Sequence, residues 1–365
     1  MAERNSMKSV KLKLSKNVIN NSITYGIVIL AFVVVQIMSA SGHLSSLTQG
    51  LLVPLCVYVI LAVSLNLTVG ILGELSLGHA GFMCVGAFTS AFFSKCTQAA
   101  IPQSGLRFLI AILIGALSAG LFGVLIGIPV LRLKGDYLAI VTLAFGEIIK
   151  NLMNVLYIGK DKNGFHFSMK DALALNMESD GTLIINGAQG ITGTPKDATF
   201  FVGIVLVLIT LFIVLNMVHS RDGRAIMSIR DNRIAAESIG INITKYKLMA
   251  FSVSAALAGI AGVLYAHNLS TLTATQKNFG YNMSVMILVF VVLGGIGNIR
   301  GSVISAVILT LLPELLRGLN NYRMLIYAIV LIAMMLFNWA PKAIEWREQH
   351  SLKDFMKAKR TKGVQ

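Results

Sequence analysis

The sequence predicts an all-α polytopic membrane protein with about ten transmembrane helices. Hydrophobic residues make up 55% of the 365 residues and charged residues only 13%, whereas soluble domains carry about 25% charged residues. Apolar runs long enough to cross a bilayer recur along the whole chain. We therefore expect a basic tail at 1–21, a transmembrane domain at 22–339 and a second basic tail at 340–365.

Ten apolar segments have the length and composition of membrane spans. We expect them at 22–40, 48–68, 74–94, 106–131, 137–158, 198–218, 248–267, 281–298, 301–317 and 322–339. Ten spans can divide into two sets of five, and an odd number in each set makes the two halves inverted, as in many transporters.

The basic residues predict the orientation of these spans. The formal net charge is +15, and the 31 Lys and Arg residues lie mainly in tails and loops. If both termini are cytoplasmic, most of these residues fall on the cytoplasmic side, as the positive-inside rule requires. The positive charge is then explained by membrane orientation, and we expect the lipid bilayer, not nucleic acid, as its partner.

Two loops are longer than the others. The outer loop, 159–197, is polar and contains GAQGITGTP; long loops often carry partner contacts. The inner loop, 219–247, has apolar residues at helical spacing but never reaches membrane length. We expect Asp231 to cap a short helix there and Gly240 to end it. Such a helix either lies on the membrane or docks a soluble partner.

A polar, glycine-rich stretch interrupts the apolar runs between Asn66 and Met83. Lipid cannot hydrogen-bond its polar side chains, so these must face protein or a water-filled route. The stretch supplies four candidates for a translocation path: Asn66, Glu74, Ser76 and His79.

The same stretch also has a purely structural interpretation. Glu74 would cap the start of a helix, and neighbouring helices would pack closely against Gly73, Gly78 and Gly81. A catalytic His–Glu pair is not favoured, because neither a nucleophile nor a ligand partner accompanies it. We therefore predict no catalytic residues. The three cysteines form no C-x-x-C pair and no even-numbered framework, so we also predict neither a disulfide scaffold nor a metal site.

Glycines near the end of the eighth span predict a local turn. A tight turn or a close helix contact explains this group better than a substrate site does. The group consists of Gly294, Gly295 and Gly297.

Five collinear blocks resemble the branched-chain amino acid ABC importer permeases of the LivM type, in the LivH/LivM permease family. The blocks are NLTVGILGELSLGHAGFMCVGAF (66–88), LRLKGDYLAIVTLAFGEII (131–149), GAQGITGTP, GRAIMSIRDNRIAAESIGINITKYKLMAFSVSAALAGIAGVLYA (223–266) and VVLGGIGNIRGSVISA (291–306). The resemblance extends from about Leu51 to Phe337 and departs from the family pattern at 160–186.

This resemblance implies an ATP-driven importer in the bacterial cytoplasmic membrane. Two permease subunits form the path, two cytoplasmic ATPases drive it, and an extracytoplasmic binding protein delivers leucine, isoleucine or valine. The chain would be one permease of a heterodimer, without enzymatic activity or a cofactor of its own. It carries no G-x-x-x-x-G-K-[ST] phosphate loop, so ATP is expected to bind to separate subunits.

The segment AAESIG at 235–240 is similar to the permease motif whose helix inserts into an ATPase cleft. Attraction to anionic lipid is the alternative explanation for the basic residues in this loop. The ATPase-coupling residues that the resemblance implies are Arg224, Arg230, Asp231, Arg233, Ala236, Glu237 and Gly240.

Glu147 and Lys150 lie one helical turn apart within a span. An unpaired charge at mid-bilayer costs about 3 kcal/mol or more, so a structural ion pair is the favoured interpretation. The alternative is that Glu147 lies in the path and attracts the ammonium group of an amino acid substrate.

Two other functions remain open. One is a related importer for urea, short amides or another small polar solute. The other is an ion-coupled secondary transporter, which would favour intramembrane acidic clusters; the sequence instead places Glu147 beside a lysine.

Overall fold

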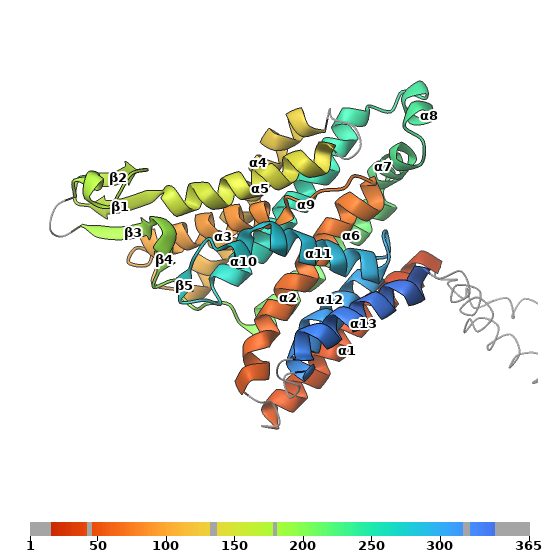
Figure 1. Cartoon of the computed structure of the whole chain (residues 1–365), viewed down its shortest axis with the longest axis horizontal. Helices are drawn as coiled ribbons and strands as arrows, with labels where there is room; N and C mark the ends of the chain where they lie inside the picture. The colour runs from red at the N-terminus through yellow and green to blue at the C-terminus, as the bar shows by residue number, and fades with distance from the viewer. Residues whose placement is uncertain (1–15, 42–45, 132–136, 178–180, 317–321, 340–365) are drawn as a thin grey trace, which may run out of the picture. The chain divides into compact units, whose positions relative to one another are not determined.

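The computed structural model describes residues 16–41, 46–131, 137–177, 181–316 and 322–339 (Figure 1). The chain divides into two compact units, Met1–Gln49 and Gly50–Gln365. The first unit holds α1 (Lys16–Ala40) and the first residues of α2 (Ser46–Asn66). Both predicted tails lie largely outside the described residues.

Helices make up most of the second unit. After α2 come the π-helix η1 (Leu67–Leu72), α3 (His79–Cys96), α4 (Ser104–Val130), α5 (Tyr137–Val155), α6 (Phe200–His219), α7 (Arg221–Asp231), α8 (Arg233–Ser238), α9 (Ile243–Ala266), α10 (Gln276–Phe279), α11 (Tyr281–Gly294), α12 (Ile299–Leu315) and α13 (Arg323–Trp339).

Each of the ten predicted segments overlaps a helix. Six spans in the described part of the chain are long and apolar enough to cross a bilayer: Thr48–Leu72, Ser104–Val130, Tyr137–Val155, Phe200–His219, Ile243–Ala266 and Gln276–Gly294. The chain is thus a polytopic helical protein, while the full count of ten, the orientation and the two inverted halves remain predictions.

Helices α3, α4 and α9 form the most closely packed part of the second unit. Their backbones approach at glycines, where a side chain would have no room. A Cβ atom added at Gly86 on α3 would lie 2.5 Å from the Cα atom of Gly259 on α9. A Cβ atom added at Gly81 would lie 2.7 Å from the Cα atom of Gly146 on α5. A side chain at Gly81 would therefore collide with α5.

The outer loop contains β-strands, so the all-α prediction is incomplete. Strands β1 (Tyr157–Asp161), β2 (Gly164–Ser168) and β3 (Thr182–Asn186) form an antiparallel sheet in the order β2-β1-β3. The loop also holds short 3-10 helices η2 (Leu173–Leu175) and η3 (Gly187–Gln189), and β4 (Ile191–Thr192) pairs with β5 (Thr271–Leu272).

The sheet and the α7–α8 segment lie at opposite ends of the second unit (Figure 1). Helix α5 leads directly into β1, and α6 leads directly into α7. The two long loops of the sequence are therefore separated by the length of the helices that connect them.

Candidate functional site

The polar stretch after α2 is a break between helices. α2 continues into η1, which ends at Gly73 in the left-handed conformation (φ 79°). Residues 74–78 are not helical, and α3 begins at His79 with Gly78 as its N-cap. The predicted start of the third span at residue 74 is therefore wrong. A positive φ suits glycine and ends the helix before Glu74.

Glu74 does not cap a helix start, in contrast to the structural interpretation of the sequence. Its carboxylate instead forms an ion pair with Lys247 on α9, whose side chain is 5% exposed. A buried lysine needs such a partner, since an unpaired buried charge is costly. The pair ties the helix break to the first turns of α9.

Asn66 connects the end of α2 to the turn between α11 and α12. Its Nδ2 donates to Ser302 Oγ (2.8 Å), and its Oδ1 accepts from the backbone N–H of Gly297 (2.9 Å). The side chain is fully buried. These partners could not be predicted from local sequence patterns, because they lie more than two hundred positions away along the chain.

The predicted glycine turn is present after α11. Gly295 and Gly297 have positive φ values of 91° and 81°. Gly294 packs directly against the backbone of Gly301 on α12, where a Cβ atom would overlap it. The three glycines thus form a turn and a close contact between α11 and α12.

His79 and Ser76 lie in the break and at the start of α3. His79 Nε2 is 2.7 Å from Ser64 Oγ on α2. Ser76 Oγ is buried and has no hydrogen-bond partner among the described residues. Gly78 packs against the carbonyl group of Thr142 on α5, with no room for a Cβ atom.

Glu147 belongs to an ion-pair cluster between α5 and the start of α11. Its carboxylate lies 2.5 Å from Lys150 Nζ and accepts from Gln276 Nε2 (3.0 Å) and the backbone N–H of Tyr281 (2.8 Å). Lys150 also donates to Gln276 Oε1. The predicted structural pair is present, and the cluster caps α11 as well.

The inner loop folds into two helices. Ser220 caps α7 by accepting from the N–H of Gly223 (3.0 Å). Ile226 is buried against Leu67, Ile71 and Leu72, so α7 packs on η1. Of the apolar residues at helical spacing in this loop, Ile226 and Ile229 are buried, whereas Ile234 and Ile239 are exposed.

Asn232, not Asp231, caps α8. Asn232 Oδ1 accepts from the N–H of Ala235 (3.0 Å), whereas Asp231 is the last residue of α7 and pairs with Arg230 (2.9 Å). The predicted cap was therefore misplaced by one position. Asn232 has the extended backbone of an N-cap residue (φ −154°), whereas Asp231 is still part of α7.

Gly240 ends α8 as predicted. It has φ 84°, and its N–H donates to Glu237 O (3.0 Å) while Ile241 N–H donates to Ala236 O (3.1 Å). This pair of bonds is a Schellman motif. Ala236 is buried against Ile229 and Ile243, so it attaches α8 to the membrane domain.

The opposite side of α8 is exposed. Ile234 is 81% exposed and Ile239 is 74% exposed. Arg233, Glu237 and, on α7, Arg224 are also exposed. Two large aliphatic side chains among charged residues on a short, well-capped helix are typical of a surface that binds a partner.

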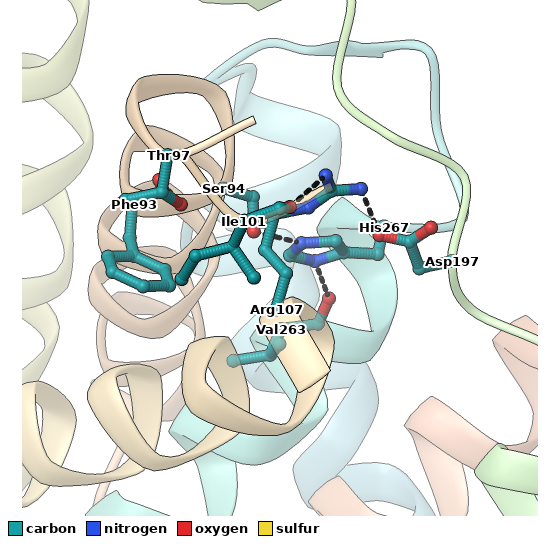
Figure 2. A network of polar contacts seen from close by, with 8 residues as sticks. All are labelled: Phe93, Ser94, Thr97, Ile101, Arg107, Asp197, Val263 and His267. Atoms are coloured by element: carbon teal, nitrogen blue, oxygen red, sulfur yellow. Dashed lines mark hydrogen bonds and ion pairs between the residues drawn. The ribbon is translucent and has the colours of Figure 1, made fainter. Parts of the chain in front are cut away.

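A second polar network lies at the sheet end of the helices (Figure 2). Arg107 on α4 pairs with Asp197 (3.2 Å) and donates to Ile101 O (3.2 Å). His267 lies 2.8 Å from Ser94 Oγ and 2.9 Å from Val263 O. Sequence reasoning missed this Arg107 cluster (Ser94, Arg107, Asp197 and His267). The sequence feature that could have indicated this cluster is the pair of opposite charges, Arg107 and Asp197, at the starts of two predicted spans.

Comparison with known proteins identifies the family. Residues 47–337 match the family model described as branched-chain amino acid transport system / permease component. The chain belongs to this family.

Two similar proteins support the same assignment. The permease is 35% identical over 318 residues to the high-affinity branched-chain amino acid transport system permease protein LivM of Salmonella typhimurium, covering 85% of this chain and 72% of that protein. It is 35% identical to LivM of Escherichia coli, covering 79% and 67%.

A more distant relative is also named as a branched-chain amino acid permease. LivH of Escherichia coli is 22% identical over 257 residues, covering 69% of this chain and 79% of LivH. No solved structure matches the permease. The relatives are named as permease proteins of transport systems, not as enzymes. Together with its apolar helices, this makes the permease a multi-pass membrane protein, in bacteria of the inner membrane.

Proposed function

We propose that this chain is a permease subunit of an ABC importer for leucine, isoleucine and valine. A second permease of the LivH kind completes the path, two cytoplasmic ATPases drive it, and an extracytoplasmic binding protein delivers the substrate. The observation that carries the proposal is the similarity to LivM over most of the chain, together with a capped surface helix suited to docking.

Helix α8 and the adjoining face of α7 form the ATPase docking surface in this proposal. Ile234 and Ile239 would enter an apolar pocket of the ATPase, and Arg224, Arg233 and Glu237 would make the polar contacts around them. Ala236 and Gly240 have a different role, since they hold α8 in place. Attraction to anionic lipid would explain the arginines. It would not explain why buried residues attach both α7 and α8 to the membrane domain.

We propose that the helix break at residues 73–78 forms part of the translocation path. Asn66, Glu74, His79 and Glu147 all engage other side chains or backbone groups in this structure. The hydroxyl of Ser76 is buried without a partner and remains available to a polar group of a substrate.

Reconstitution tests this function. The chain, a LivH-type permease, the ATPases and the binding protein are placed in lipid vesicles, and ATP-dependent uptake of labelled leucine is measured. Arg233→Glu combined with Glu237→Arg should abolish assembly with the ATPases, while Lys170→Glu on the outer loop should not. Normal uptake by the double variant would show that the loop is only a lipid anchor.

Import of a sugar is a distant alternative function, based on one relative. The ribose import permease RbsC of Escherichia coli is 32% identical over 125 residues, which is 32% of this chain. The same vesicles should therefore be supplied with labelled ribose and its binding protein. Uptake of ribose but not of leucine would overturn the proposed substrate.

The proposed topology places both termini and residues 219–247 in the cytoplasm and residues 159–197 outside. Single cysteines at Ser238 and Lys170, both exposed, test it in a background without Cys56, Cys84 and Cys96. An impermeant reagent should label position 170 from outside and position 238 only from inside. The reverse pattern would contradict the topology.

A further inference from the structure

Arg230 differs from the other residues expected at the docking surface, because its guanidinium group reaches the membrane domain. Its Nη1 donates to the backbone carbonyl of Gly70 in η1 (2.9 Å). Its Nε and Nη2 donate to Asp231 Oδ1 (3.0 and 2.9 Å), which fixes the orientation of the planar group. Arg230 therefore joins α7 to the end of the span formed by α2 and η1.

The partner of Arg230 is chemically suited to a cation. The last carbonyl groups of a helix lack intrahelical partners and carry the negative end of the helix dipole. Gly70 lies within the last turn of η1, and Gly73 ends that helix. Arg230 supplies both the missing hydrogen-bond donor and a positive charge from a different helix.

Two glycines allow this approach. A Cβ atom at Gly73 would lie 2.5 Å from Arg230 Cγ, so the arginine stem packs on the bare backbone. A Cβ atom at Gly297 would lie 4.0 Å from Arg230 Nη1, which places the α11–α12 turn beside the same guanidinium group. Gly297 is in turn bonded to Asn66 at the start of η1.

We define the Arg230 junction as Asn66, Gly70, Gly73, Arg230 and Gly297. It brings together a π-helix and two glycines with positive φ. π-helices are rare and occur frequently at functional sites. Hinges consist of a few loop or element-terminal residues that absorb changes in backbone angles, and the junction lies at the ends of η1 and α11.

We propose that Arg230 is a positioning residue that transmits movement of α7 to η1 and to the α11–α12 turn. This inference rests on the proposed function, in which ATPases move α7 and α8. Docking is performed by the exposed residues of α8 together with Arg224 on α7, and Arg230 connects the docked segment to the helix break. Loss of Arg230 then uncouples ATP hydrolysis from transport without preventing docking.

The test compares Arg230→Gln with Arg221→Gln in the complete reconstituted complex. Arg221 lies on the same helix, is exposed and has no part in the proposed docking surface. Three quantities are measured: assembly, ATP hydrolysis and leucine uptake. The decisive value is the amount of leucine imported per ATP hydrolysed.

We expect Arg230→Gln to assemble and hydrolyse ATP while importing about tenfold less leucine per ATP, a change within the usual range of coupling free energies. Arg221→Gln should keep the wild-type ratio. Arg230→Lys should give an intermediate ratio, because one charged donor still reaches Gly70 O. If the complex with Arg230→Gln fails to assemble, the amount of leucine imported per ATP by the Arg230→Lys complex decides the test.

Two results would overturn the inference. One is a wild-type ratio in Arg230→Gln, or in Arg230→Lys where the Gln variant fails to assemble. The other is an equal loss in Arg221→Gln and Arg230→Gln. Failure of the wild-type complex to import leucine would instead refute the proposed function, so the two failures are distinguishable.

Discussion

The Arg107 cluster and the Arg230 junction use the same residue type at opposite ends of the second unit, with different surroundings. The Arg107 side chain is 6% exposed and faces a carboxylate, Asp197, that is 14% exposed. The Arg230 side chain is 37% exposed and reaches a backbone carbonyl of a π-helix. The first arrangement stabilises the packing of regular helices, and the second connects a surface helix to backbone that can change conformation.

Arg107→Ala should produce the largest loss of stability. It leaves Asp197 without its ionic partner, and breaking a buried pair costs about 3–5 kcal/mol. Arg230→Gln, by contrast, should cost about 0.3–1 kcal/mol, as expected for an exposed cation at a helix end. Thermal unfolding in detergent measures both, with Lys170→Ala as a surface control. Equal losses would remove the distinction between the two arginines.

Glu74→Gln should have the next largest effect. The variant leaves Lys247 buried beside a neutral amide, at a cost of about 1–3 kcal/mol. Uptake should fall as well, because the break at 73–78 loses its connection to α9. Adding Lys247→Met should restore part of the stability but not the uptake. Full recovery of uptake in the double variant would show that the ion pair has no role beyond folding.

Asn232→Ala should have a smaller and local effect. Loss of an N-cap costs about 1 kcal/mol, and here the loss affects only α8. We expect weaker binding of the ATPases with an unchanged unfolding temperature of the membrane domain. Asp231→Ala is the matched neighbour, since Asp231 caps no helix. A greater loss of binding in Asp231→Ala would contradict the assignment of the cap.

Ser76→Ala should have the smallest effect on stability. Its hydroxyl group makes no hydrogen bond among the described residues, so its removal leaves no partner unsatisfied. If Ser76 contacts substrate, the concentration of leucine that gives half-maximal uptake should rise while stability stays constant. An unchanged uptake curve would exclude Ser76 from the path.

Local sequence patterns predicted the positions of the helices and the glycine turn. Apolar length located the spans, and Gly240 and the glycines at 294–297 marked turns that only glycine adopts easily. The sheet was missed, although DKNG at 161–164 carried a turn signal: Asp161 Oδ1 accepts from the N–H groups of Asn163 and Gly164.

The partners of the polar side chains could not be predicted from sequence. Glu147 and Lys150 are one helical turn apart, so their pair was found. Glu74 meets Lys247, Asn66 meets Gly297, and Arg230 meets Gly70 only after the helices pack. These long-range contacts depend on tertiary structure, which hydrophobic periodicity does not specify.

Hydrogen–deuterium exchange on the complete complex tests the central comparison most directly. The complex is examined in lipid nanodiscs without nucleotide and with the ATPases trapped closed by vanadate. We predict that exchange changes in α7 and in Leu67–Gly78, while peptides containing Ser94, Arg107 and His267 keep the same exchange in both states. A change at the Arg107 cluster with none at Leu67–Gly78 would contradict the account, because it would place the movement at the wrong end of the permease.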